Sequence, residues 1–188
     1  MPLEYQNQDS EQTLLEAINE YHAHLEAIGR KILTDAQGAD PIWLYHDATH
    51  AIFGQDTSLE EEAALDFWVL FGSDISWRLI RQYERLPEIK ALNKAIIRQL
   101  GIGHIPLVYW RNRRPLWQVF RNTRQMTEKW PFQVPRALLE CRLSELRKQY
   151  GIKVLTPEQK VPSRTTAFDY SVVSAHRPKD HGHTAYLS

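Results

Sequence analysis

The sequence predicts an all-α protein: one compact domain of six or seven helices in an orthogonal or bundle-like arrangement, followed by an irregular C-terminal tail. Helical periodicity of the apolar residues dominates most of the chain, whereas strand-like runs such as "YSVVS" at 170–174 are short. The length of 188 residues, 43% of them hydrophobic, suits one domain with one core. The expected helices span residues 11–32, 41–53, 59–71, 75–86, 87–100, 106–126 and 135–150.

The first two helices are predicted from their capping residues and apolar faces. Ser10 is expected to cap the first helix. Its apolar face consists of Leu14, Ala17, Ile18, Tyr21, Leu25, Ile28 and Ile32. Asp40 and Pro41 are typical of an N-cap and a first helical residue, so they are expected to begin the second helix. Gly54 follows the expected end of that helix.

The third helix is expected to be central, because after Ala63 it is apolar on nearly all sides. Ser58 and Glu61 have the spacing of a capping box at its start. Gly72 and Ser73 are expected to end it.

Prolines and glycines divide the remaining helices. Pro87 begins the fifth helix and Gly101 ends it. Pro115 is expected to kink or split the long sixth helix. Pro135 begins the last helix, which ends before Gly151.

From Lys153 onward, turn-forming residues and scattered charges replace helical periodicity. We therefore divide the chain into a helical domain, residues 1–152, and an irregular tail, residues 153–188, wrapped on the body of the protein.

The composition excludes several classes of protein. Lys plus Arg and Asp plus Glu number 23 each, so the overall charge gives no indication of nucleic-acid binding. The single cysteine, Cys141, excludes an internal disulfide and is typical of a reducing compartment. The N-terminal run "MPLEYQNQDSEQ" resembles neither a signal nor a transit peptide, and no apolar run is long enough to span a bilayer. We therefore expect a cytoplasmic protein.

Two histidines and an aspartate lie within about one helical turn in the stretch "WLYHDATHAIFGQDTSLEEE". Asp47 and His46 precede His50 by three and four residues, so all three side chains can converge on one point outside the helix. Of the acids in the next helix, Glu61 is committed to the capping box, whereas Glu62 lies on an otherwise buried stripe. Two imidazoles and two carboxylates suit a divalent transition metal.

The surroundings of this cluster leave two interpretations open. Asp66, one turn after Glu62, is placed to accept a hydrogen bond from a ligand histidine. Zinc is the metal expected in purified protein, with Fe, Co, Mn and Mg as alternatives. In the other interpretation the polar residues solvate one side of an ordinary helix. His22 and His24 are two residues apart on the first helix and face different ways, so we do not expect them to share a metal.

The pattern resembles the metal signature of the ubiquinone (coenzyme Q) biosynthesis protein four family, with matching residues His46, Asp47, His50, Gly54 and Glu62. The run "LSELRKQYGI" is similar to that family's C-terminal helix, and the resemblance covers roughly residues 41–152. It implies that the matching His, Asp, His and Glu coordinate a divalent metal. It also implies an all-α protein that forms a homodimer, binds prenylated lipids and associates peripherally with membranes.

The resemblance further implies an activity: removal of the ring carboxylate of a polyprenylated benzoate and hydroxylation of that carbon, alongside other quinone-biosynthesis enzymes. This chain departs from the family at Glu61, where the family has Gly, at Asp66, where it has Lys, and near Val69, where an acid is missing. Two other functions are considered: a non-catalytic scaffold that binds prenyl lipids, and a metal-dependent phosphohydrolase.

Large aromatic rings are abundant, with six Trp, eight Tyr and six Phe. Rings of this size can line an apolar tunnel for an isoprenoid chain, and arginines can meet a phosphate or lipid headgroup. The residues proposed for prenylated-lipid or prenyl-phosphate binding are Trp68, Trp110, Arg111, Arg114 and Trp117. The alternatives are ordinary core packing for the rings and a solvated loop for the arginines. With no membrane span, attachment would be peripheral, on the inner face of the membrane.

Overall fold

The computed structural model describes residues 3–30, 32–33, 35 and 41–162. In these residues the α-helices are α1 Leu14–Ala27, α2 Ile42–Phe53, α3 Leu59–Gly72, α4 Trp77–Arg85, α5 Pro87–Leu100, α6 His104–Arg111, α7 Arg113–Thr123 and α8 Leu143–Tyr150. Short 3-10 helices span Glu4–Gln6, Arg136–Glu140 and Pro157–Gln159. Extended pairing within the described residues is confined to two isolated bridges. The all-α prediction is confirmed, with eight α-helices in this part of the chain rather than six or seven.

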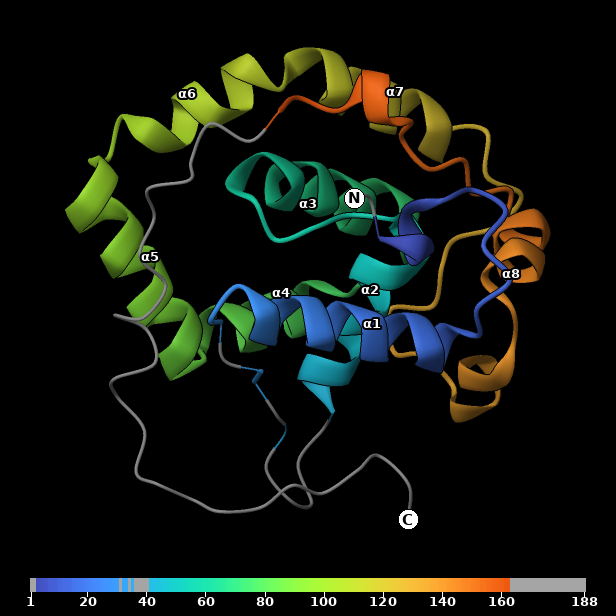
Figure 1. Ribbon diagram of the computed structural model, residues 1–188. Coiled ribbons are helices and arrows are strands. Elements are labelled where there is room, and N and C mark those ends of the chain that lie inside the picture. Colours follow the sequence, from blue (N-terminus) through green and yellow to red (C-terminus); the bar gives the residue numbers. More distant parts are fainter. Residues whose placement is uncertain (1–2, 31, 34, 36–40, 163–188) are drawn as a thin grey trace.

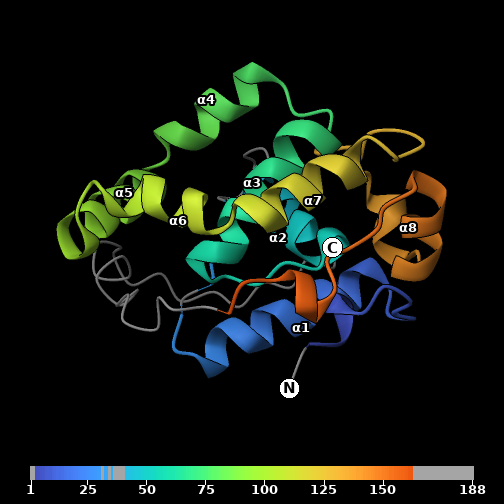
Figure 2. The same cartoon turned by 90° about the horizontal axis from the view of Figure 1, so that it is seen from above.

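The predicted central helix, α3, lies in the middle of the molecule (Figure 1). It packs against α2, α6 and α7, while α1 packs against α2. Viewed from above, α1 and α4 lie on opposite sides of this centre (Figure 2). Trp68 of α3 is fully buried, but Leu70 and Phe71 near its end are exposed. The helix is therefore central without being enclosed along its whole length.

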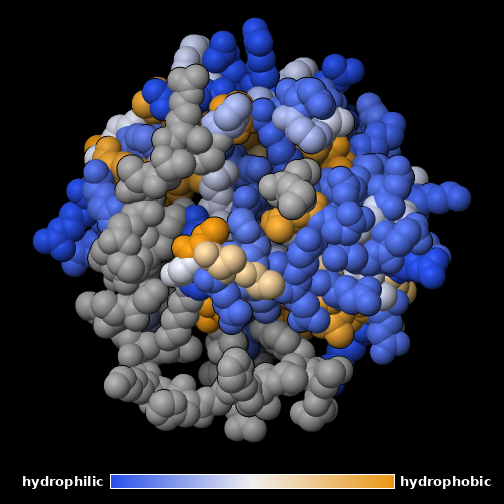
Figure 3. All heavy atoms as spheres, in the orientation of Figure 1, coloured by the Kyte–Doolittle hydropathy of each residue, from blue (hydrophilic) through white to orange (hydrophobic). Residues whose placement is uncertain are grey.

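The main hydrophobic core is built by helices from both ends of the chain. It joins buried residues of α1, α2, α3, α7 and α8, and α6 contributes Val108. None of its members comes from residues 70–107, among the side chains that the structure describes. On the face of the molecule seen in Figure 3, hydrophilic residues predominate and apolar side chains form scattered patches. The core is thus formed by the two ends of the sequence, and the middle of the chain lies outside it.

The first helix begins later than predicted. Thr13, not Ser10, is its N-cap: the Thr13 side chain accepts a hydrogen bond from the backbone N–H of Glu16, and the Glu16 carboxylate accepts one from the Thr13 N–H. Thr13 also forms an antiparallel bridge with Arg142. This long-range pairing fixes the chain just before the helix. The helix also ends earlier than the predicted residue 32: α1 stops at Ala27, and Gly29, with φ of 72°, follows its end.

The second and third helices follow the prediction closely. α2 ends at Phe53, and Gly54 adopts a left-handed conformation with φ of 64°. Ser58 caps α3 by accepting a hydrogen bond from the Glu61 backbone N–H. The Glu61 side chain accepts instead from the Asp56 backbone N–H, so the reciprocal bond of a capping box is replaced by a contact within the loop. The predicted N-cap Asp40 lies outside the described residues.

The long helix predicted around Pro115 is split, but the break falls at Asn112. Asn112 is buried, and its side-chain amide donates a hydrogen bond to the Glu60 carbonyl at 3.3 Å. Pro115 lies in the first turn of α7, where its missing N–H costs no helical hydrogen bond. A tertiary contact of the asparagine therefore accompanies the break, while proline is accommodated inside a helix.

The last predicted helix, from Pro135 to Gly151, is wrong in its first half. Residues Arg136–Glu140 form a 3-10 turn, and Cys141 and Arg142 are extended before α8 begins. The backbone N–H of Leu14 donates to the Cys141 carbonyl at 2.9 Å, so pairing with the N-terminal segment interrupts the helix.

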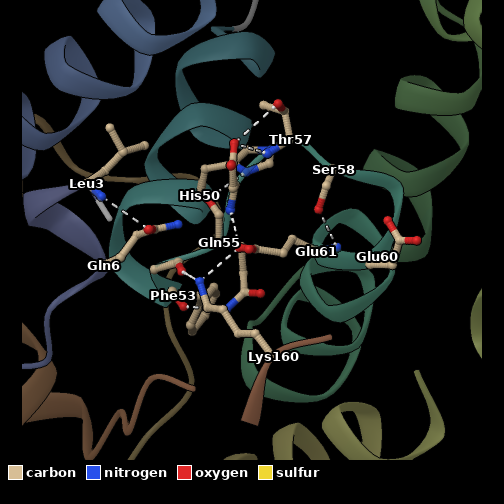
Figure 4. A network of polar contacts seen from close by, with 12 residues as sticks. Leu3, Gln6, His50, Phe53, Gln55, Thr57, Ser58, Glu60, Glu61 and Lys160 are labelled. Atoms are coloured by element: carbon tan, nitrogen blue, oxygen red, sulfur yellow. Dashed lines mark hydrogen bonds and ion pairs between the residues drawn. The ribbon is translucent and has the colours of Figure 1, made fainter. Parts of the chain in front are cut away.

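The first ten residues of the predicted tail pack on the body. Val154 and Leu155 are buried in the main core. Lys160 donates to the Gly54 carbonyl at 2.7 Å and to the Glu61 carboxylate at 2.9 Å, which fixes the loop between α2 and α3 (Figure 4). The rest of the tail, with the predicted strand-like run at 170–174, lies outside the described residues.

Candidate metal centre

His46, His50 and Glu62 lie together at the junction of α2 and α3. The two histidines are one turn apart on α2, and Glu62 stands in the first turn of α3. Gly54 ends α2 in a conformation that favours glycine, so a short loop leads into α3. Figure 4 shows His50 beside Gln55 of this loop, with Ser58 and the start of α3 next to it. The four-residue spacing of the histidines places them on one face of α2, and the short loop after Gly54 brings Glu62 of α3 opposite them.

The three side chains converge. One potential ligand atom from each of His46, His50 and Glu62 lies within 4.8 Å of the other two. The Nε2 atom of His50 is 3.7 Å from a carboxylate oxygen of Glu62, and the centroids of the two imidazole rings are 4.7 Å apart. This spacing allows one small cation to contact all three residues.

The buried imidazole of His50 is oriented with one nitrogen unpartnered. Its Nδ1 lies 3.2 Å from the Gln55 carbonyl, and because a carbonyl only accepts, Nδ1 carries the proton. The Nε2 atom faces Glu62 and is buried without a hydrogen-bond partner. Burial, together with the charge of His46, lowers the pKa of His50 well below its usual value. The ring is therefore neutral and presents a lone pair, as a metal ligand must.

Aromatic rings hold both imidazoles in place. Tyr21 of α1 stacks on His50 with ring centroids 4.6 Å apart, and Tyr83 of α4 stacks on His46 at 5.5 Å. Trp43 meets His46 edge-on at 6.1 Å. Rings from three helices thus pack against the two imidazoles, while the Glu62 side chain remains 34% exposed. The local dielectric is lowest at His50, which is fully buried.

The charges of the cluster are unbalanced without a cation. Burial raises the pKa of Glu62 to about 7, although the charge of His46 acts in the opposite direction. For His46, burial lowers the pKa, but a hydrogen bond to Asp47 and the charges of Glu62 and Asp66 raise it overall. A divalent ion would remove this conflict, because it favours an ionised carboxylate and a neutral imidazole together.

Asp47 is adjacent to the cluster but is not one of its three convergent residues. One carboxylate oxygen of Asp47 lies 2.7 Å from Nε2 of His22, and the other lies 3.5 Å from Nδ1 of His46. Asp47 is therefore placed between two histidines, where it orients His46 so that the opposite nitrogen, Nε2, remains for a metal.

His22 is the residue that sequence reasoning missed. We considered it only as a chelating partner of His24, and the structure shows that the two do face different ways: His24 pairs with Asp56 at 3.2 Å. One feature of the sequence could have indicated that His22 lies near the cluster. It directly follows Tyr21, which is buried on the face of α1 that packs on α2. Its pairing with Asp47 depends on that helix packing.

Asp66 is close to the cluster, but its carboxylate accepts a hydrogen bond from the hydroxyl of Tyr109 at 2.7 Å. The carbonyl of Gln55 takes the role predicted for Asp66, because it is the acceptor for Nδ1 of His50. Asp66 does lie one helical turn after Glu62 on α3, as predicted. Its contact with Tyr109 of α6 depends on how the helices pack, which local spacing does not show.

The residues predicted to bind a lipid divide between the core and the surface. Trp68 is fully buried and stacks on Phe53 with ring centroids 4.7 Å apart, so it is part of the core. Trp110 and Trp117 are exposed on α6 and α7, and so are the two predicted arginines, Arg111 and Arg114. The structure thus assigns one of these residues to packing and four to the protein surface.

We found no match to this chain among protein-family models, functionally described proteins or solved structures. The donor set of the site is therefore the evidence for its chemistry. Two imidazoles and one carboxylate are the ligands of many catalytic zinc sites and of non-haem iron oxygenases. Both kinds of site keep coordination positions open for water or substrate. The residues present fit such a metal.

Proposed function

We propose that this protein binds one divalent metal through His46, His50 and Glu62 and acts on a polyprenylated aromatic ring in ubiquinone biosynthesis. The observation that carries the metal site is the unpartnered Nε2 of His50, buried and directed at Glu62. A buried polar atom without a partner is unfavourable, and a metal would satisfy it. The ring substrate is proposed from the resemblance of the sequence pattern to the ubiquinone biosynthesis protein four family.

The three-residue donor set favours an enzyme over a scaffold. A metal held by only three side chains keeps open positions, whereas a structural zinc site is closed by four. A metal bound here would polarise a ring carboxylate or phenolate as a Lewis acid, and iron would also supply the oxygen chemistry of hydroxylation. Zinc is expected in purified protein, and iron or cobalt suits the same ligands.

The surrounding residues have their own tasks in this proposal. His22 and Asp47 fix the orientation of His46, and the Gln55 carbonyl fixes that of His50. Tyr21 covers the fully buried imidazole of His50, and Tyr83 covers one face of the partly exposed imidazole of His46. The prenylated substrate implies a protein at the membrane surface, and none of the helices in the described residues is long and apolar enough to cross a bilayer. We also propose that the protein forms a homodimer and works together with other quinone-biosynthesis enzymes.

Replacing His22 with alanine is expected to weaken metal binding by roughly 10- to 100-fold, because Asp47 loses the partner that fixes it against His46. Isothermal titration with Zn²⁺ and the absorption spectrum of the Co²⁺-loaded protein measure this effect. His22→Gln, which keeps a donor near Asp47, should recover part of the affinity. His24→Ala is the matched control on the same helix and should leave it unchanged. Equal affinities for wild type and His22→Ala would contradict the positioning role.

Affinity for prenylated phenols is expected to rise with chain length, because each added isoprene unit buries further apolar surface until the site is full. Tryptophan fluorescence measures the binding, since three of the six Trp side chains, Trp77, Trp110 and Trp117, are exposed. Phenols with one, three and six isoprene units would be compared with the corresponding prenyl phosphates. Equal and weak binding at all lengths would show that the prenyl chain is not recognised.

A further inference from the structure

The charge of this neutral chain is strongly segregated. Between residues 77 and 124, which hold helices α4 to α7, there are eleven Lys and Arg but only two Glu, a net charge of +9. The remaining residues therefore carry −9, since the whole chain is neutral. The zero overall charge, which gives no indication of nucleic-acid binding, hides this asymmetry. We call residues 77–124 the basic arm.

Exposed apolar side chains gather in the same region. Of the ten large apolar residues that are exposed in the structure, nine lie between residues 70 and 117. The most exposed are Ile102, at 76%, followed by Trp77, Trp110 and Trp117, at 70%, 66% and 60%. Arg113 lies over the Trp110 ring, 5.0 Å from its centroid. Exposed tryptophans interleaved with arginines are typical of a surface that enters the interface of a membrane.

The first half of the arm, α4 and α5, is weakly held by the rest of the protein, whereas α6 and α7 pack against α3. α4 has no buried residue, and its aromatic contacts to the body are those of Tyr83 with His46 and Trp43. In α5, Ala95 and Ile96 form a small apolar cluster of their own, separate from the main core. A nine-residue helix gains little stability from its own hydrogen bonds in water, so α4 requires a surface against which to pack.

One face of α4 is suited to phosphate groups. Arg78, Arg81, Gln82 and Arg85 recur at helical spacing and line a recess of about 430 Å³. The three arginines are exposed, and the ion pairs found within the described residues include none of them. Their guanidinium groups are therefore available to bind phosphate oxygens in pairs.

We propose that the basic arm docks on a bilayer that contains anionic phospholipids. Trp77, Trp110 and Trp117 enter the headgroup region, and the arginines of α4 bind lipid phosphates. Figure 1 shows α5, α6 and α7 following one another as an arc along one side of the molecule, which gives the bilayer an extended surface to meet. The positive charge of the arm complements a negatively charged leaflet.

A bilayer fits these observations better than a nucleic acid or an acidic protein. Nucleic acids attract the same arginines, but they offer no apolar phase for Ile102 or for the edges of isolated tryptophans. The docking does not depend on the metal. It deepens the proposed function in one respect, because α4 also carries Tyr83, so a docked arm would place the metal centre beside the layer that holds a prenylated substrate.

Flotation with vesicles tests the proposal. The full chain is expected to float with vesicles of phosphatidylcholine plus phosphatidylglycerol, to bind vesicles of phosphatidylcholine alone at least roughly 10-fold more weakly, and to be released by high salt. The double substitution Arg81→Glu with Arg85→Glu and the pair Trp110→Ala with Trp117→Ala should each lower anionic-vesicle binding by about 10-fold or more. These residues are exposed, so the variants should melt like the wild type.

The matched control is Arg136→Glu with Lys148→Glu, which makes the same change of charge at exposed positions outside the arm. Binding that is equal for both vesicle types, or lost equally in the control, would overturn the proposal. So would tighter binding to a DNA or RNA duplex than to anionic vesicles, which would identify a nucleic-acid surface. A His50→Ala variant, which loses a metal ligand that stacks on Tyr21 of α1 and not on the arm, should still float normally, so a failure of the proposed metal function is distinguishable from a failure of docking.

Discussion

His50→Ala is expected to abolish stoichiometric metal binding. Wild-type protein should carry close to one divalent ion per chain, because its two imidazoles and one carboxylate converge within 4.8 Å. Removing an outer-shell partner of a metal ligand already costs about 10- to 100-fold in affinity, so removing a ligand should cost more. Elemental analysis and titration with Zn²⁺ measure the loss. His46→Ala and Glu62→Ala should show the same effect.

Two controls separate this loss from general damage. His24→Ala removes a histidine that pairs with Asp56 outside the cluster, and Glu60→Gln changes an acid two residues before Glu62. In Figure 4, Glu60 points away from His50. Both controls should retain the metal. Unchanged metal content in all three ligand variants would show that the cluster is an ordinary polar contact between helices.

Arg147→Met is expected to lower the free energy of unfolding by about 3–5 kcal/mol, because several buried carbonyls lose a donor and each unsatisfied buried acceptor costs about 1–3 kcal/mol. Arg147 is fully buried, and burial lowers the pKa of its guanidinium to about 10, so it is still charged at neutral pH. It donates hydrogen bonds to backbone carbonyls at the end of α2 and in the N-terminal segment. These acceptors are Ala51, Ile52, Tyr5, Asn7 and Gln8.

The physical reason is that the buried carbonyls of Tyr5 and Ile52 lose the guanidinium as their donor, whereas those of Ala51 and Asn7 each keep one backbone N–H, from Gly54 and Ser10. The C-terminal carbonyls of a helix need a donor from outside, and Arg147 supplies it for Ala51 and Ile52 of α2. Arg147→Lys should also be destabilised, because a single ammonium group cannot reach acceptors spread around a planar fork. Since α2 carries His46 and His50, metal affinity should fall with stability.

Urea denaturation followed by circular dichroism measures the change. Lys148→Met is the matched control: it is the next residue on α8, it is exposed, and it should change stability by less than about 0.5 kcal/mol. A loss below about 1 kcal/mol in Arg147→Met would mean that water replaces the guanidinium and that the network is not needed for folding.

The sequence by itself determined the features that depend on neighbours within one or two turns. The periodicity of the apolar residues predicted the helices, and four-residue spacing placed His46 and His50 on one face. Gly54 marked the end of α2 because a left-handed turn favours glycine, and Ser58 marked the start of α3 through its side-chain cap. The short link between these two elements is why Glu62 could be placed opposite the histidines.

The tertiary structure decided everything that depends on residues far apart in the chain. His22 meets Asp47 across 25 positions, and the bonds of Arg147 to the carbonyls of Tyr5 and Ala51 span 142 and 96. No local pattern encodes such pairs, because they arise only when helices pack. The same holds for the tryptophans: composition counted six, but packing put Trp68 in the core and left three others exposed. Helical spacing fixes which face a side chain takes, whereas packing fixes what that face meets.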